Sequence, residues 1–142
     1  MDSGKSALGL DGNVAAALGY PVGIIAIISL IMEKENRFVK FHALQSILLH
    51  VVFLVLAIAL VIIFVILTIV GAVASVASSA AGSSVGALGG MFSGLVGMLL
   101  FLVYMVMIVL YLVGLIMSAV KAYQGQMYKI PMIGNMADKW IK

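Results

Sequence analysis

Hydrophobic residues do not alternate with polar ones in this chain but run almost without interruption. Residues 41–120 contain no Asp, Glu, Lys or Arg. A charged side chain at the centre of a bilayer costs about 2.5–3.5 kcal/mol, so a charge-free stretch of this length is typical of membrane helices. The pattern therefore predicts an all-α integral membrane protein.

Three apolar segments are long enough to cross a bilayer, which takes about 20 residues. The first covers residues 13–32, and Pro21 should kink it because proline cannot donate the helical hydrogen bond. The second and third, at residues 43–70 and 94–120, are longer and should form a hairpin. We expect one membrane domain that ends in a short interfacial segment, a cytoplasmic foot at residues 121–142.

The segment between the second and third spans, residues 71–93, is uncharged and consists mainly of Gly, Ala and Ser. Gly82, Gly86, Gly90 and Gly94 recur at every fourth position. Small residues at this spacing are typical of a glycine zipper, in which membrane helices pack closely. A flexible Gly/Ser connector explains the composition equally well, and both interpretations stay open at this point.

Positive charge is unevenly distributed between the predicted loops. All basic residues except Lys5 follow the first or the third span, namely Lys34, Arg37, Lys40, Lys121, Lys129, Lys139 and Lys142. Because cytoplasmic loops are enriched in Lys and Arg, three spans predict a multi-pass protein with its N-terminus outside and its C-terminus in the cytoplasm. Topology accounts for the basic residues, so we expect no nucleic-acid partner.

Residues at the start of the second span combine cations with aromatic rings. Aromatic rings settle at the membrane interface and cations meet lipid phosphates, so these residues predict a site for anionic lipid headgroups or for a partner protein. The set comprises Arg37, Phe38, Lys40, Phe41 and His42, together with Trp140 in the C-terminal segment.

Polar residues inside the second and third spans form the candidate stripe Gln45, Ser46, His50, Tyr104 and Tyr111. We hypothesise that the two helices face each other and that Tyr111 reaches His50. Interior packing is the ordinary role of such residues. A single His can also ligate a tetrapyrrole or a metal, but no second His lies at the same depth, so we expect neither a cofactor nor a metal.

The residues named so far do not predict catalysis. The spans contain no carboxylate for acid–base chemistry, and the chain contains no Cys. We therefore expect a protein that is not an enzyme.

Two motifs resemble a known family. The first is Asn36-Arg37-Phe38-Val39-Lys40-Phe41-His42-Ala43, and the second places Gly125, Tyr128, Pro131 and Gly134 at three-residue intervals. Both are similar to motifs in a family of small prokaryotic membrane proteins of unknown function. That family is itself similar to the twenty-kilodalton subunit of the translocon at the inner chloroplast envelope. The resemblance implies the cytoplasmic (inner) membrane of a prokaryote.

Two functions fit these expectations. The first is an accessory or structural subunit that joins other membrane-protein subunits or self-associates in a larger complex. The alternative, which the resemblance suggests, is a pore or protein-translocation component.

Overall fold

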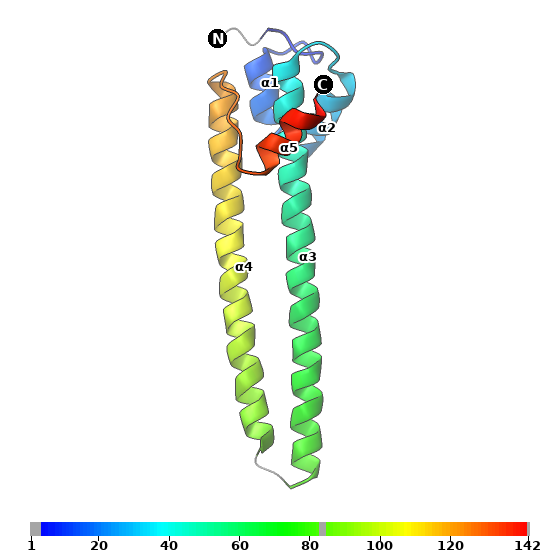
Figure 1. Ribbon diagram of the computed structural model, residues 1–142, viewed down its shortest axis with the longest axis vertical. Coiled ribbons are helices and arrows are strands. Elements are labelled where there is room, and N and C mark those ends of the chain that lie inside the picture. Colours follow the sequence, from blue (N-terminus) through cyan, green and yellow to red (C-terminus); the bar gives the residue numbers. More distant parts are fainter. Residues whose placement is uncertain (1–3, 83–84, 142) are drawn as a thin grey trace. The chain divides into compact units, whose positions relative to one another are not determined.

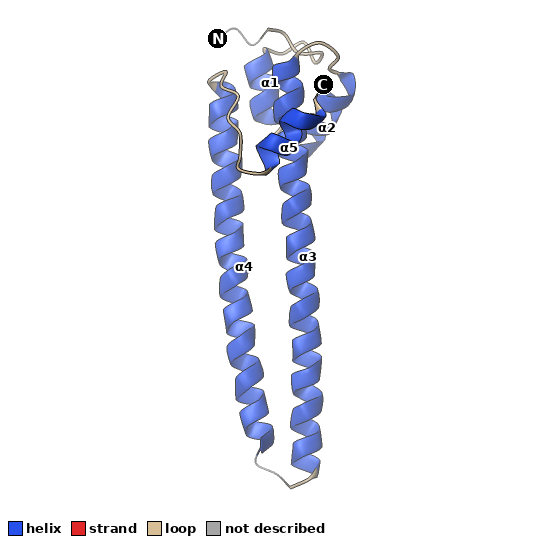
Figure 2. Ribbon diagram, viewed as in Figure 1, coloured by secondary structure: helices blue, strands red, loops and turns tan. Residues whose placement is uncertain are grey.

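The computed structural model describes residues 4–82 and 85–141. These residues form helices and no strands, with one isolated antiparallel bridge between Lys5 and Asp11. The helices are shown in order in Figures 1 and 2: α1 (Gly12–Leu18), α2 (Gly23–Met32), α3 (Arg37–Ala80), α4 (Val85–Tyr123) and α5 (Ile133–Trp140).

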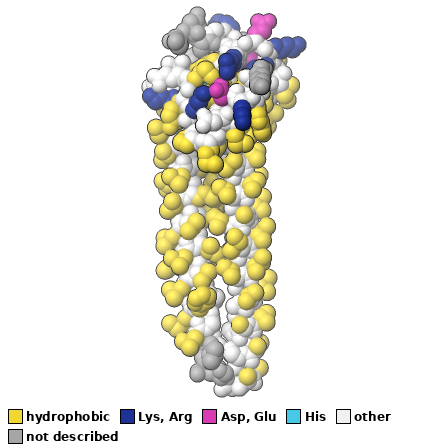
Figure 3. All heavy atoms as spheres, in the orientation of Figure 1, with side chains coloured by type: hydrophobic (Ala, Val, Ile, Leu, Met, Phe, Trp, Pro, Cys, Tyr) yellow, Lys and Arg dark blue, Asp and Glu magenta, His cyan; other side chains and the backbone are white. Residues whose placement is uncertain are grey.

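The chain divides into two compact units. Unit 1 consists of Met1–Phe53 and Leu110–Lys142, and unit 2 consists of Leu54–Val109. Helices α3 and α4 therefore each contribute one part to unit 1 and one part to unit 2. Figure 3 shows hydrophobic side chains along both helices.

The predicted first span is wrong as a single kinked helix. Residues 13–32 instead form α1 and α2, with a turn at residues 19–22 between them. Proline can neither donate a backbone hydrogen bond nor change its φ angle, so Pro21 favours this turn. The two helices contact each other. Gly19 permits a close approach, since a Cβ atom there would lie 3.4 Å from the Cβ of Ala26.

Direct contacts join the N-terminal segment to the loop that follows α2. The backbone N–H of Ala7 donates to Oε2 of Glu33 at 2.8 Å, and the side chain of Asn36 donates to the Lys5 carbonyl at 3.3 Å. Asn13 in α1 donates to the carbonyl of Tyr123 at 2.9 Å. A membrane crossing at residues 13–32 would separate these groups by the thickness of a bilayer. The structure therefore does not uphold the expectation that the two ends of the chain lie on opposite faces.

Two helices within the described residues are long and apolar enough to cross a membrane, namely α3 and residues Leu88–Tyr123 of α4. Helix α3 begins at a side-chain cap, because Oδ1 of Asn36 accepts the backbone N–H of Val39 at 3.2 Å. The predicted spans at 43–70 and 94–120 lie inside these helices.

Most of the small-residue segment 71–93 is helical rather than a flexible connector. Its first part ends α3 and its last part begins α4, and Gly82 occupies the turn with a φ of 65°. The hydroxyls of Ser75, Ser78, Ser79 and Ser93 bond back to carbonyls of their own helix. For example, Ser79 donates to the Ser75 carbonyl at 2.8 Å. This back-bonding removes their need for other polar partners.

The four-glycine series does not form a continuous packing face. A Cβ at Gly86 would lie 2.6 Å from Oγ of Ser78, so this glycine permits a close contact. Gly82 lies in the turn, whereas Cβ atoms at Gly90 and Gly94 would meet nothing within 4 Å. The predicted glycine zipper is therefore limited to its Gly86 position.

Unit 1 has a small core. Ala16, Tyr20 and Ala122 are buried together, and Phe38 and Leu115 pack against them partly buried. This cluster brings α1, the turn after it, α3 and α4 into contact within the unit. Tyr20 also belongs to the polar network described next, and Phe38 contacts the His42 ring of that network.

Candidate functional site

The centre of unit 1 is a network of buried polar side chains. Tyr20, His42 and Gln45 are all fully buried. The Tyr20 hydroxyl lies 3.0 Å from Nδ1 of His42, and Nε2 of Gln45 donates to the same hydroxyl at 2.7 Å. Burying a polar group without a partner is costly, so each of these three residues depends on the other two.

The direction of the hydrogen bonds follows from the fixed groups in the network. Nε2 of His42 lies 3.1 Å from the carbonyl of Gln126, which can only accept, so Nε2 carries the proton in the neutral ring. Nδ1 then accepts from the Tyr20 hydroxyl, which in turn accepts from Gln45. Both ring nitrogens of His42 are thus engaged within the protein.

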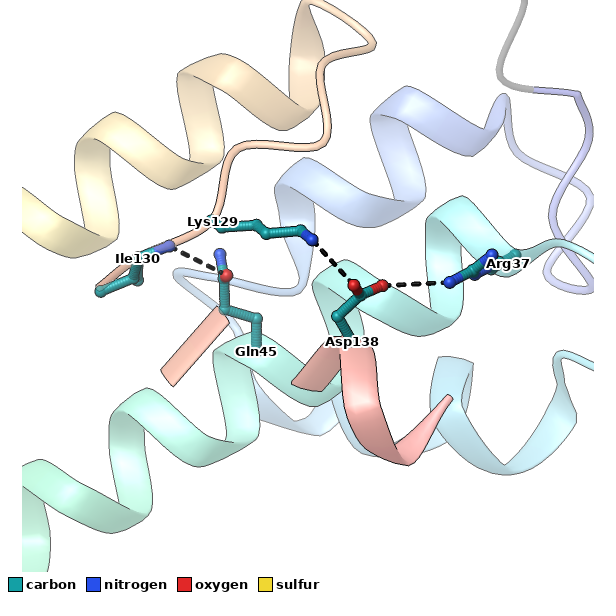
Figure 4. A network of polar contacts seen from close by, with 5 residues as sticks. All are labelled: Arg37, Gln45, Lys129, Ile130 and Asp138. Atoms are coloured by element: carbon teal, nitrogen blue, oxygen red, sulfur yellow. Dashed lines mark hydrogen bonds and ion pairs between the residues drawn. The ribbon is translucent and has the colours of Figure 1, made fainter. Parts of the chain in front are cut away.

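The network extends into the segment that precedes α5. Gln45 donates from Nε2 to the carbonyl of Tyr128 at 3.1 Å. Its Oε1 accepts the N–H of Ile130 at 3.2 Å, as Figure 4 shows. Ser46, one helical position further, donates to the Gly19 carbonyl at 2.7 Å. Neighbouring residues of α3 therefore hold the α1–α2 turn and the C-terminal segment in place.

Gly134 in α5 lies directly against this network. A Cβ atom at this position would lie 2.6 Å from Oε1 of Gln45 and 2.7 Å from Cα of Lys129. Because one of these neighbours is backbone, it could not move aside cheaply. The C-terminal segment therefore packs onto α3 only with glycine here.

Two residues expected at lipid headgroups are buried inside unit 1. Phe41 and His42 are both fully buried. The His42 ring meets Phe38 and Phe41 edge-on, with centroid distances of 4.7 and 5.1 Å. The structure does not support the prediction that these two residues anchor the chain at the membrane surface, because both side chains lie in the interior of unit 1. Trp140, by contrast, is 63% exposed.

The expected basic residues of this region have partners near the unit's surface. Asp138 in α5 accepts from Arg37 at 3.1 Å and from Lys129 at 2.7 Å (Figure 4). Lys40 donates to the carbonyl of Lys34 at 3.2 Å. We call Arg37, Asp138 and Lys129 the ion-pair clasp, since they join the start of α3 to α5 and to the segment before it.

The hydrogen bond from Lys129 holds the pKa of Asp138 below its usual value. Desolvation opposes this shift as the second-largest effect, while the positive charges of Lys129 and Arg37 and the hydrogen bond from Arg37 lower the pKa further. The clasp is therefore fully formed at neutral pH and depends on the carboxylate staying ionised.

The predicted intramembrane stripe separates into three groups. Gln45 and Ser46 belong to the buried network. The rings of His50 and Tyr111 meet edge-on with a centroid distance of 5.7 Å, while Nδ1 of His50 lies 2.7 Å from the Ser46 carbonyl. The Phe53 ring stacks on the Tyr111 ring, with a centroid distance of 4.2 Å. The remaining residue, Tyr104, belongs to unit 2.

Sequence reasoning missed Tyr20, Glu33 and Asp138 as structural centres. The signal for Tyr20 is a polar group beside a proline in an apolar run, a combination that indicates a turn with a buried partner. The signal for Asp138 is an acidic residue within a basic C-terminal segment. Glu33 gives no comparable signal, because one of its two partners is the backbone N–H of Ala7, which lies far away in the sequence.

The chemistry available in unit 1 is hydrogen bonding and ion pairing. Within residues 4–82 and 85–141, no three His, Cys, Asp or Glu side chains are grouped as a metal ion would require. The network has its donors and acceptors paired with each other, so it is best described as the element that fixes the structure of unit 1.

Replacing Tyr20 with Phe should destabilise unit 1. The substitution keeps the ring but leaves Nδ1 of His42 and one N–H of the Gln45 amide without their partner, which costs about 1–3 kcal/mol. The thermal midpoint of the purified protein should fall. Tyr123→Phe is the matched control, because Tyr123 is 63% exposed. Equal midpoints for the two variants would contradict the role of the network.

The ion-pair clasp should open in acid. Because the pKa of Asp138 is lowered in the folded protein, the carboxylate stabilises the clasp above about pH 4, the ordinary Asp value, and this contribution is lost as pH falls through the lowered value. Hydrogen exchange of α5 should therefore rise between pH 6 and pH 3 after correction for intrinsic rates. Asp138→Asn should exchange faster already at neutral pH and lose this pH dependence. An unchanged pH profile in that variant would exclude Asp138 as the cause.

Comparison with known proteins places this arrangement in a family. A family model described as the magnetosome magnetite crystal formation protein family matches residues 7–137. A UPF0132 membrane protein of Methanocaldococcus jannaschii is 54% identical over 56 residues, which are 39% of this chain and 51% of that protein. A UPF0132 membrane protein of Archaeoglobus fulgidus is 55% identical over 47 residues, or 32% of this chain and 46% of that protein.

These comparisons support the expected family of small prokaryotic membrane proteins but do not show the similarity to the chloroplast translocon subunit. The matched segments span about half the length of the curated relatives. No solved structure matches the chain. The family model covers nearly all of the described residues, and the chain therefore belongs to the magnetosome magnetite crystal formation protein family.

Proposed function

We propose that this protein is a non-enzymatic accessory subunit of a membrane-bound assembly. The observation that carries the proposal is the surface of unit 2. Residues 54–109 contain no charged side chain, and large hydrophobic side chains are exposed on both helices, among them Val55, Val61 and Leu99 at 56–59%. A surface that is apolar all round needs lipid or protein against it. Burial in a bilayer supplies this cover.

The proposal places two crossings, α3 and α4, in the membrane. The described charged residues then all belong to unit 1. Under the positive-inside rule, this places residues 4–11, the loop after α2 and the C-terminal segment together on the cytoplasmic face. Burial of the polar network leaves the exposed Lys139 and Trp140 of α5 to meet anionic headgroups or a partner subunit.

The family description refers to the formation of magnetite crystals. Our proposal assigns this chain the membrane part of such an assembly and assigns it no residues that bind mineral. Neither the family match nor the apolar surface of unit 2 favours the alternative of a pore or translocation component.

Single cysteines test the orientation, since the chain has no Cys of its own. We expect Ala7→Cys, Glu35→Cys and Gln124→Cys to react with a membrane-impermeant maleimide only from the cytoplasmic side. Ala81→Cys, beside the turn between α3 and α4, should react only from the opposite side. Reaction of Ala7→Cys and Glu35→Cys from opposite sides would restore a membrane crossing at residues 13–32.

The composition of the native complex tests the accessory role. After mild solubilisation of its own membranes, the 14.9 kDa chain should be recovered in a larger particle that contains other polypeptides. Mass spectrometry identifies these companions. Trp140→Ala combined with Lys139→Ala should weaken the association, while the thermal midpoint stays unchanged because both side chains are exposed. Recovery of this polypeptide alone would refute a heteromeric role.

A further inference from the structure

Unit 2 contains a groove of about 610 Å³ between the α3 and α4 segments. Ligand pockets in proteins typically measure about 300–1,000 Å³, so the volume suits a small molecule or part of one. Its lining includes Leu60, Phe64 and Thr68 from α3 and Gly90, Gly94 and Tyr104 from α4.

The lining presents a mainly apolar surface, and two of its polar side chains are bonded to their own helices. The Thr68 hydroxyl donates to the Phe64 carbonyl at 2.7 Å, and the Ser93 hydroxyl, also in the lining, donates to the Gly90 carbonyl at 3.0 Å. Tyr104 is the third polar side chain of the lining. An ordered water needs about two to four polar partners, so this lining does not suit water.

Glycines on α4 account for the space. Cβ atoms at Gly90 and Gly94 would meet nothing within 4 Å. At two other places the helices come close, since a Cβ at Gly97 would lie 3.3 Å from the Phe64 ring and one at Gly71 would lie 2.8 Å from Cβ of Ser93. These close approaches leave no room between α3 and α4 for a third helix, whose diameter is about 10 Å.

We propose that this groove binds one hydrocarbon chain, the acyl or isoprenoid tail of a membrane lipid. Empty apolar space loses dispersion contacts, and a slender, flexible chain can restore them where a helix cannot enter. The surrounding surface of α3 and α4 is apolar, so the hydrocarbon chain of the lipid can enter the groove directly from the bilayer. This inference rests on the proposed function only in requiring that unit 2 lies in the membrane.

The test uses the full-length protein in phosphatidylcholine vesicles that contain a trace of phosphatidylcholine with a diazirine in one acyl chain. After illumination, mass spectrometry maps the labelled residues. We expect labelling at the groove residues Leu60 and Phe64 to exceed labelling at Ile62 and Val106, which lie outside the groove and are 53% and 59% exposed.

Matched glycine variants make the result specific. Gly94→Leu should place a side chain in the groove and remove most of the labelling at Leu60 and Phe64, without changing that at Ile62. Gly89→Leu is the control, because a Cβ there also meets nothing within 4 Å but Gly89 does not line the groove. Both variants should keep the helical circular-dichroism spectrum, since leucine favours a helix more than glycine does.

Each outcome has a defined meaning. Labelling that is equal inside and outside the groove would show ordinary boundary lipid and overturn the inference, while leaving the proposed function intact. Absence of label both in the groove and at Ile62 and Val106 would show that unit 2 does not lie in the bilayer. This result would overturn the inference and the proposed function together. Disulfides between copies carrying Tyr104→Cys, with no lipid label in the groove, would assign it to a second copy of the chain and overturn the inference. Native mass spectrometry of the extracted protein then identifies the source, and a retained phospholipid or isoprenoid lipid would each support the proposal.

Discussion

The structure of unit 1 depends on the hydrogen bonds among Tyr20, His42 and Gln45. These fully buried groups must find partners, and the partners come from the α1–α2 turn, from α3 and from the segment before α5. Hydrophobic packing alone specifies little in a chain of this composition, since nearly any face of its helices is apolar. Directional bonds between polar groups distant in sequence supply the missing specificity. The described residues of unit 2 form no such network, and its helices approach each other at small residues instead.

The sequence was sufficient to predict the long helices and insufficient to predict unit 1. The charge-free run at residues 41–120 indicated α3 and α4 because hydropathy reports directly on a helix that needs no polar partner. Residues 13–32 passed the same test of length and hydropathy but form two helices. Their break depends on a turn at Pro21 whose neighbouring Tyr20 is held by α3, and spacing along the chain does not reveal that contact.

The burial of His42 could not be predicted for the same reason. A His flanked by Phe38, Phe41 and cations at the end of an apolar run fits a membrane interface as well as it fits a core. The deciding contact is the Gln126 carbonyl, which comes from the far end of the chain. The four-glycine series shows the converse case. Its regular spacing predicted a continuous packing face that the helices do not form. Only the position of the turn at Gly82 determines which glycines meet α3 and which leave space.

The finding that residues 13–32 form two helices strengthens the argument from the distribution of positive charge. With three spans, Lys5 was an exception to the positive-inside rule. With two crossings, Lys5 lies with the other described basic residues in unit 1, and the apolar unit 2 carries no charge at all. The same rule then fits without an exception. The hydrogen bond from Ala7 to Glu33 holds the segment that carries Lys5 beside the loop after α2, where further basic residues lie.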